Sequence, residues 1–147
     1  MAINKVKGLT IHEMLTRVGE CKTREEKINE LREYNSLALR DVLKGGYDDT
    51  IQFILPSGAP PYKEANEKSP PNRLSRLTKQ FRYFVVGGPG ENMPQTRVET
   101  MYIRLLESIH PDDAKLVIAM KDKKLAGLYK GVTKKLVSEA FPGLIAK

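Results

Sequence analysis

Apolar residues recur at intervals of three and four positions along almost the whole chain, and this spacing constrains its fold more than any other feature. Such spacing places the apolar side chains on one face of an α-helix, whereas a half-buried strand needs strict alternation. The segment that follows the capping box at residues 23–26 is typical, because it carries Leu31 and Tyr34 at helical spacing. The sequence therefore predicts an all-α fold, a compact bundle of about seven or eight short helices without a sheet.

Capping residues and glycines set the expected ends of the helices in the first half. Thr10 predicts the start of a first short helix, and Gly19 is expected to close it. Gly45 and Gly46 are expected to end a third helix in the same way. The six residues from Thr50 to Leu55 fit a strand or a helix, and the lack of a convincing partner strand favours a short helix.

The second half shows further helical signals. Residues 73–86 predict an amphipathic helix with a basic outer face. A capping box at residues 96–99 predicts the start of the next helix. His110 precedes Pro111, which suits a first helical turn, so we expect His110 to cap the helix that follows. Thr133 is expected to cap a final helix.

Residues 56–72 differ in character from the rest of the chain, since they hold five of its nine prolines among Ser, Gly, Asn, Lys and Glu. A loop of this length is uncommon inside a compact domain. It either joins two helical lobes, residues 1–55 and 73–147, or decorates one body. We expect a single helical domain over residues 1–147, in one or two lobes.

The net charge of +7 comes entirely from the second half of the 147-residue chain. Residues 1–72 hold 11 basic and 11 acidic side chains, whereas residues 73–147 hold 14 and 7. Seven lysines lie within residues 115–135, where Asp122 is the one acid. A basic surface favours contact with phosphates through the release of counterions, although such surfaces also occur on proteins that bind nothing acidic.

Residues that could support catalysis or bind a metal are sparse. Cys21 is the single cysteine, and with only His12 and His110 beside it the sequence predicts no disulfide, no metal site and no cofactor. Phosphate-binding motifs are missing, and residues 87–90 lack the spacing of a nucleotide fingerprint. No apolar run reaches about 18 residues, so we expect no membrane insertion and a location inside the cell. The sequence predicts a protein that is not an enzyme.

The closing segment, residues 131–145, reads Gly-Val-Thr-Lys-Lys-Leu-Val-Ser-Glu-Ala-Phe-Pro-Gly-Leu-Ile. It resembles the end of the N-terminal DNA-binding domain of T-even-phage-type ATP-dependent DNA ligases, where a capped basic helix precedes an aromatic-Pro-Gly-Leu-Ile run. The segments 23–31, 35–42 and 47–56 are similar to the first helices of that domain, whereas residues 57–95 match poorly. The whole chain also resembles a family of uncharacterised small proteins of T-even-related marine phages.

This resemblance implies a stand-alone DNA-binding domain that contacts the backbone of double-stranded DNA. The chain has no Lys-x-Asp-Gly motif, the site where ligases attach AMP, so no catalytic domain and no ligation are expected. Little sequence preference is expected, because no arrangement for reading base edges is apparent. The resemblance and the local charge predict these contact residues in the C-terminal segment: Lys121, Lys123, Lys124, Lys130, Gly131, Thr133, Lys134 and Lys135. The basic face of the 73–86 helix adds Arg73, Arg76, Lys79 and Arg82.

A protein-interaction module is the alternative that the sequence leaves open. The long Pro-rich loop and the lack of a base-reading element favour docking on a replication, transcription or virion protein. Either hypothesis places the protein in the host cytoplasm, and the virion is a second location to consider.

Overall fold

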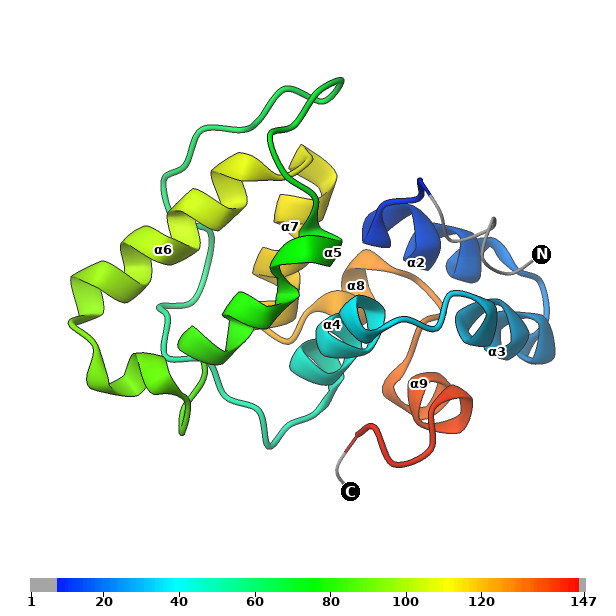
Figure 1. Cartoon of the computed structure of the whole chain (residues 1–147). Coiled ribbons are helices and arrows are strands. Elements are labelled where there is room, and N and C mark those ends of the chain that lie inside the picture. Colours follow the sequence, from blue (N-terminus) through cyan, green and yellow to red (C-terminus); the bar gives the residue numbers. More distant parts are fainter. Residues whose placement is uncertain (1–7, 146–147) are drawn as a thin grey trace.

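The computed structural model describes residues 8–145, and within that range it confirms the all-α prediction. Short helices account for the regular structure, and no strand beyond one isolated bridge occurs among these residues. Figure 1 shows how the helices are arranged. The α-helices are α2 (Ile11–Glu20), α3 (Arg24–Glu33), α4 (Leu37–Tyr47), α5 (Leu74–Leu77), α6 (Gln95–Ser108), α7 (Pro111–Lys121), α8 (Leu125–Leu128) and α9 (Lys134–Ala140), and the 3-10 helices are η1 (Thr78–Tyr83) and η2 (Pro89–Asn92).

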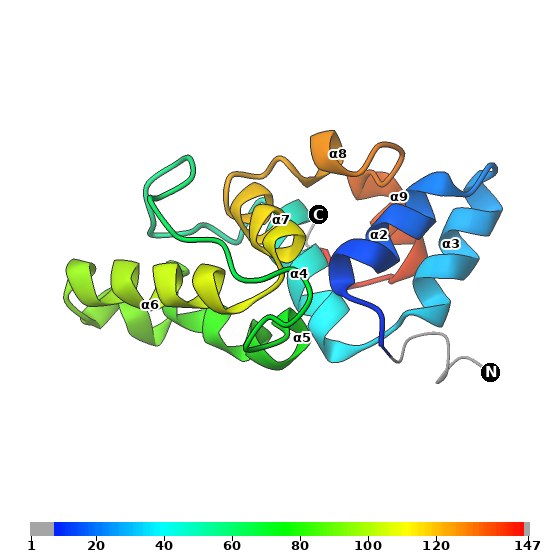
Figure 2. The ribbon, with the colours of Figure 1, turned by 90° about the horizontal axis from the view of Figure 1, so that it is seen from above.

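Helices α4 and α7 pack against each other in the middle of the molecule. On one side of this pair, α3 packs against both α2 and α9. On the other side, α6 packs against α7, and η1 packs against α4. Figure 2 shows α6 and α5 extending away from α2 and α3, so that the molecule is longer than it is wide.

The hydrophobic core runs through both halves of the chain without a break. Leu15 and Leu31 from the first half belong to the same buried cluster as Leu106 and Val137 from the second half. Because α9 packs on α3, the end of the chain closes over its beginning. Loop 56–72 therefore decorates one body and does not join two separate cores.

The Pro-rich loop is held along α6 and α7 by a few backbone contacts. The amide of Lys63 donates to the carboxylate of Glu107 on α6 at 2.8 Å. The amide of Asn72 donates to the carbonyl oxygen of Ser108 at 2.8 Å. Asp122, just after α7, accepts from the amide of Gly58 at 3.0 Å.

The prediction that Gly45 and Gly46 end a helix is wrong. Both lie inside α4, which ends at Tyr47. A Cβ atom on Gly46 would collide with the side chain of Leu125, and one on Gly45 would lie 3.0 Å from the sulfur of Met120. The two glycines therefore let α7 and α8 approach the backbone of α4, and this packing outweighs the low helix propensity of glycine.

Two other expected boundaries also differ from the structure. Gly19 lies within α2, which ends at Glu20, and the first residue of α6 is Gln95, after Pro94. Thr96 is thus inside the first turn of α6 and caps nothing. The expected cap at Thr10 is confirmed, because its hydroxyl accepts from the amide of Glu13 at 3.1 Å.

Residues 50–55 do not form the expected short helix. Phe53 forms an antiparallel bridge with Val85, in which the amide of Ile54 donates to the carbonyl of Phe84 at 2.8 Å. The amide of Val86 donates to Gln52 at 2.7 Å. The partner segment lies beyond the Pro-rich loop. The helix expected over residues 73–86 is a short α-helix, α5, followed by the 3-10 helix η1, and it has already ended at Tyr83 before this bridge.

Buried Asp113 links the start of α7 to the start of α2. Its carboxylate accepts from the amide of His12 at 3.0 Å, and so satisfies one of the free amides at the start of α2. His110 caps α7 as expected, since its Nδ1 accepts from the amide of Asp112 at 3.0 Å. Burial raises the pKa of the Asp113 carboxyl above its ordinary value, although the His12 amide opposes the shift.

Two buried tyrosines offer a matched test of this packing. The hydroxyl of Tyr47 donates to the carbonyl of Val132 at 2.6 Å, whereas the buried hydroxyl of Tyr102 has no partner among the described residues. We expect Tyr47→Phe to lower the free energy of unfolding by about 1 to 3 kcal/mol, because the Val132 carbonyl loses its donor. We expect Tyr102→Phe to change it by less than about 0.5 kcal/mol. Urea unfolding of both variants would measure the difference, and equal losses would contradict it.

The raised pKa of Asp113 predicts a pH dependence of stability. The folded state holds this proton more readily than the unfolded state, so the ionised carboxyl costs stability at neutral pH and its protonation removes that cost. Asp113→Asn keeps an oxygen for the His12 amide but carries no charge. We expect the stability of Asp113→Asn relative to the wild type to rise between about pH 4 and about pH 7. Urea unfolding at both pH values would measure it, and a constant difference would refute this account.

Candidate functional site

Two of the lysines predicted for a DNA-binding surface instead hold the fold together. The side chain of Lys121 is only 2% exposed, and its ammonium contacts Asp122 at 2.6 Å and the carbonyl of Pro56 at 2.7 Å. The ammonium of Lys123 donates to the carbonyls of Gly45 and Asp48 at the end of α4. Partial burial lowers the pKa of Lys123. Both ammonium groups face inward, which leaves them unavailable to a phosphate on the surface.

The remaining predicted C-terminal residues lie around α8 and α9, and all are exposed except Gly131, which is half-buried. We call them the α8–α9 cluster: Lys124, Lys130, Gly131, Thr133, Lys134 and Lys135. Thr133 caps α9 as expected, because its hydroxyl accepts from the amide of Leu136 at 3.1 Å. Lys134 is paired with Asp49 at 2.9 Å. Gly131 has a φ of 87°, and a Cβ there would lie 2.6 Å from the ammonium of Lys27 on α3. Lys27 thus joins the cluster, although no signal in the sequence placed it there.

A second exposed group follows α5 and η1, and we call it the basic row: Arg73, Arg76, Lys79 and Arg82. Within residues 8–145 none of the four forms an ion pair. No acidic residue occurs anywhere in residues 68–90. Side chains three positions apart align along a 3-10 helix, so Lys79 and Arg82 point the same way on η1. The guanidinium of Arg82 also lies 5.0 Å from the ring centre of Tyr83.

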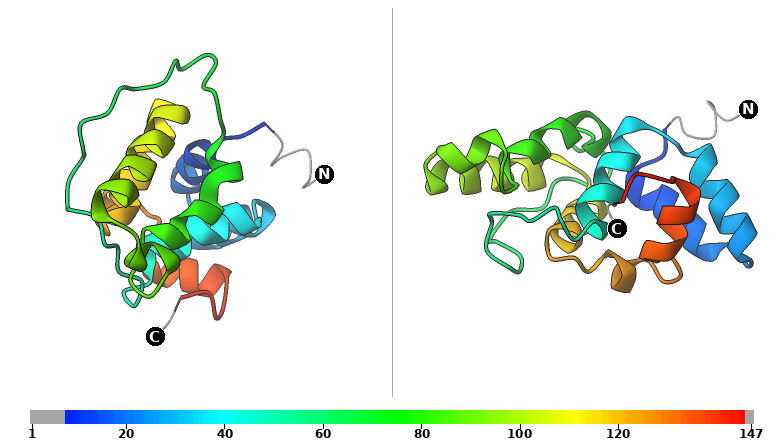
Figure 3. Two further views of the ribbon diagram at one scale, coloured as in Figure 1. Left: turned by 60° about the vertical axis from the view of Figure 1, so that its left-hand side comes forward. Right: turned by 90° about the horizontal axis from the view of Figure 1, so that it is seen from below.

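The two basic groups lie on opposite sides of the molecule. Figure 2 shows α8 on one side of α4 and α7, with α5 on the other side, and the right-hand view of Figure 3 shows the same order from below. The packing of the helices agrees with this arrangement. The basic row lies on α5 and η1, which pack against α4, whereas α8 packs against α7. The predicted residues therefore do not form one continuous surface.

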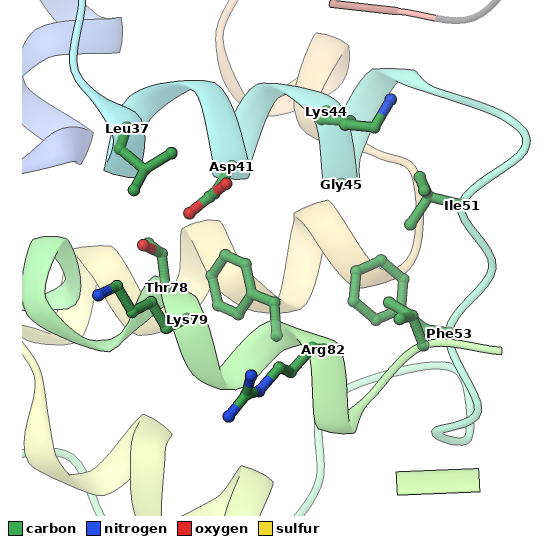
Figure 4. Close-up of a pocket in the computed structure, with 11 residues that line it drawn as sticks. Leu37, Asp41, Lys44, Gly45, Ile51, Phe53, Thr78, Lys79 and Arg82 are labelled. Carbon is green, nitrogen blue, oxygen red and sulfur yellow. The ribbon is translucent and has the colours of Figure 1, made fainter. Parts of the chain in front are cut away.

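A pocket of about 600 Å³ opens between α4 and η1, beside the basic row. Figure 4 shows Asp41 and Thr78 facing each other across it, with Leu37 at one end and Phe53 at the other. The pocket is lined by Leu37, Asp41, Lys44, Gly45, Ile51, Phe53, Thr78, Lys79, Phe81, Arg82 and Val85. The ends of Lys44, Lys79 and Arg82 lead away from its interior, so these cations lie at the rim.

Sequence reasoning missed this pocket because three separate segments build it. Residues 37–45 supply one wall, residues 51–53 the end and residues 78–85 the other wall. The bridge between Phe53 and Val85 brings the last two together across the Pro-rich loop. Only the basic face of η1 was visible in the sequence.

The two histidines, far apart in the sequence, both lie near the carboxylate of Asp112 at the start of α7. Nδ1 of His12 lies 2.7 Å from the hydroxyl of Tyr129, and Nε2 of His12 lies 3.8 Å from the carboxylate of Asp112. Nδ1 of His110 already accepts the amide of Asp112. In the described part of the chain no group of three His, Cys, Asp or Glu side chains is placed to hold a metal ion. The same residues include no helix long and apolar enough to cross a bilayer.

Comparison with known proteins gives one match. A family model described as "Family of unknown function (DUF6433)" matches residues 14–127, which is well over half of the chain. This range contains α4, the basic row and the pocket, whereas most of the α8–α9 cluster lies beyond it. No curated protein and no solved structure matches the chain.

Proposed function

The chain belongs to this family of unknown function. From the charge and exposure of its surface we propose that it is a non-enzymatic DNA-binding protein that holds the phosphate backbone of double-stranded DNA. The basic row is the observation that carries the proposal. Its four cations are exposed, carry no acidic partner among the described residues and follow one another at intervals of three. When a cation is already in an ion pair with an acidic side chain, a phosphate must displace that acid. The cations of the basic row have no such acid within residues 8–145, so a phosphate can contact them directly.

The physical driving force is the release of condensed counterions when cations contact phosphates. Arginine suits this contact because its planar group donates to two phosphate oxygens at once. Phosphate contacts alone carry no base information, so the proposal includes little sequence preference. Three of the four row residues are arginines, which fits this mode of binding.

The α8–α9 cluster is a second and separate contact surface in this proposal. Lys124, Lys130 and Lys135 are exposed and in no ion pair among the described residues, whereas Lys134 is partly neutralised by Asp49. Because this cluster faces away from the basic row, it would contact a different DNA segment. The resemblance of residues 131–145 to the ligase DNA-binding domain supports its inclusion. A phage DNA-binding protein of this kind would act in the host cytoplasm.

A protein partner is the second candidate function. Leu37 and Val86 are large apolar residues that are 56% and 52% exposed. Leu37 lies at the mouth of the pocket, where a replication, transcription or virion protein would find an apolar anchor. Affinity capture from nuclease-treated, infected cells tests this function, which requires one stoichiometric partner that Leu37→Glu no longer retains.

The DNA-binding proposal predicts a specific loss when the basic row is neutralised. We expect Arg76→Gln with Lys79→Gln to weaken binding to a labelled duplex about tenfold at low salt, because two phosphate contacts are lost. The slope of log affinity against log salt should fall by about two, since fewer counterions are released. Fluorescence anisotropy between about 50 and 200 mM salt measures both quantities.

Lys22→Gln with Lys115→Gln is the matched control, because both lysines are exposed and the change in net charge is the same. Equal losses in the two double variants would mean that total charge, and not the row, sets the affinity. A larger loss in Lys130→Gln with Lys135→Gln would transfer the interface to the α8–α9 cluster. Binding that does not change with salt would refute the proposal altogether.

A further inference from the structure

We infer that the pocket between α4 and η1 takes one unpaired base of a DNA strand whose phosphates lie on the basic row. This inference rests on the proposed function and names the class of DNA that the protein would prefer. Lys79 and Arg82 belong to the row and also to the pocket rim. A strand held by these two cations therefore passes directly over the opening.

The interior of the pocket fits a flat, mostly apolar ring. Phe53 and Phe81 provide aromatic surface, and Ile51 and Val85 add aliphatic walls. Aromatic side chains are the usual stacking partners of unpaired bases, whatever the base. A volume of about 600 Å³ lies within the range of pockets that hold small ligands, so one base with part of its sugar has room.

Asp41 gives the pocket its polarity. Its carboxylate faces Thr78 across the opening and makes no ion pair or hydrogen bond within the described chain. A carboxylate only accepts hydrogen bonds, so the group that meets it must donate. The exocyclic amine of cytosine is such a donor, and Asp and Glu are its usual partners. The negative charge also repels phosphate, so it orients a nucleotide with its base inward and its phosphate on the rim.

The same charge argues against an acidic peptide as occupant. An acidic helix would be attracted by Lys79 and Arg82 at the rim but would place its carboxylates beside Asp41, and like charges repel.

A base stacked inside a duplex cannot enter the pocket without leaving the stack, which costs free energy. The preferred ligand is therefore DNA in which a base is already unpaired, such as a duplex with one extrahelical cytosine.

The test compares three labelled duplexes of one sequence: intact, with one extrahelical cytosine, and with an abasic site at the same bulge. We expect the wild type to bind the cytosine bulge roughly tenfold more tightly than the other two, from the stacking of one base. The abasic duplex is bent in the same way but lacks the ring. Fluorescence anisotropy at one salt concentration measures all three affinities.

Two tryptophan variants separate the pocket from its surroundings. Leu37→Trp fills the mouth of the pocket from an exposed position and leaves every cation of the row in place. Val86→Trp enlarges a similarly exposed residue that does not line the pocket. We expect the first to abolish the preference for the bulge and the second to keep it. A fourth duplex, with an extrahelical thymine in place of the cytosine, tests Asp41. We expect the wild type to prefer the cytosine bulge to the thymine bulge, Asp41→Ala to reduce that preference, and Asp41→Asn, which keeps an acceptor oxygen, to restore part of it.

The outcomes distinguish this inference from the function on which it rests. Equal affinity for all three duplexes would overturn the base pocket and leave backbone binding intact. A bulge preference that survives Leu37→Trp would place the base elsewhere and also overturn it. Failure to bind any duplex would refute the proposed function and the inference together. Binding of an acidic, leucine-rich test peptide that Leu37→Trp blocks, without any bulge preference, would assign the pocket to a protein partner.

Discussion

The close approach of α4 to α7 and α8 is the contact on which the rest of this structure depends. It requires two glycines at positions 45 and 46, where a methyl group would meet Met120 or Leu125. Lys123 reinforces it by donating to the last carbonyls of α4, where the helix leaves acceptors unpaired. One face of α4 packs on α7 and α8, and another face is turned toward η1. The pocket forms between α4 and η1.

The lysines of the second half divide into two kinds by their position relative to this contact. Lys121 and Lys123 sit beside it and point inward, where they bind the Pro-rich loop and the end of α4. Lys124 and Lys130 lie only a few residues further along and face solvent. The surplus of positive charge is therefore smaller on the surface of this segment than its sequence suggests, and the basic row becomes the less compensated of the two surfaces.

The bridge between Phe53 and Val85 joins the candidate site to the fold. It closes the end of the pocket with an aromatic ring and holds the segment after η1 beside residues 52–54. The Pro-rich loop between the two partners is held by Glu107 on α6 and by Asp122 just after α7, and none of the loop residues 56–72 lines the pocket. One short contact between distant segments thus positions aromatic surface next to a row of cations.

The sequence by itself determined the helical class, the caps at Thr10, His110 and Thr133, and the basic face that carries Arg76 and Lys79. These features depend on hydrogen bonds and side-chain spacing within a few residues, which local sequence encodes. Tertiary structure alone decided that Gly46 continues a helix, that Lys121 is buried, and that Asp41 faces Thr78 across a pocket. Each of these depends on a partner from another segment, and the free energy of packing against that partner outweighs the local preference.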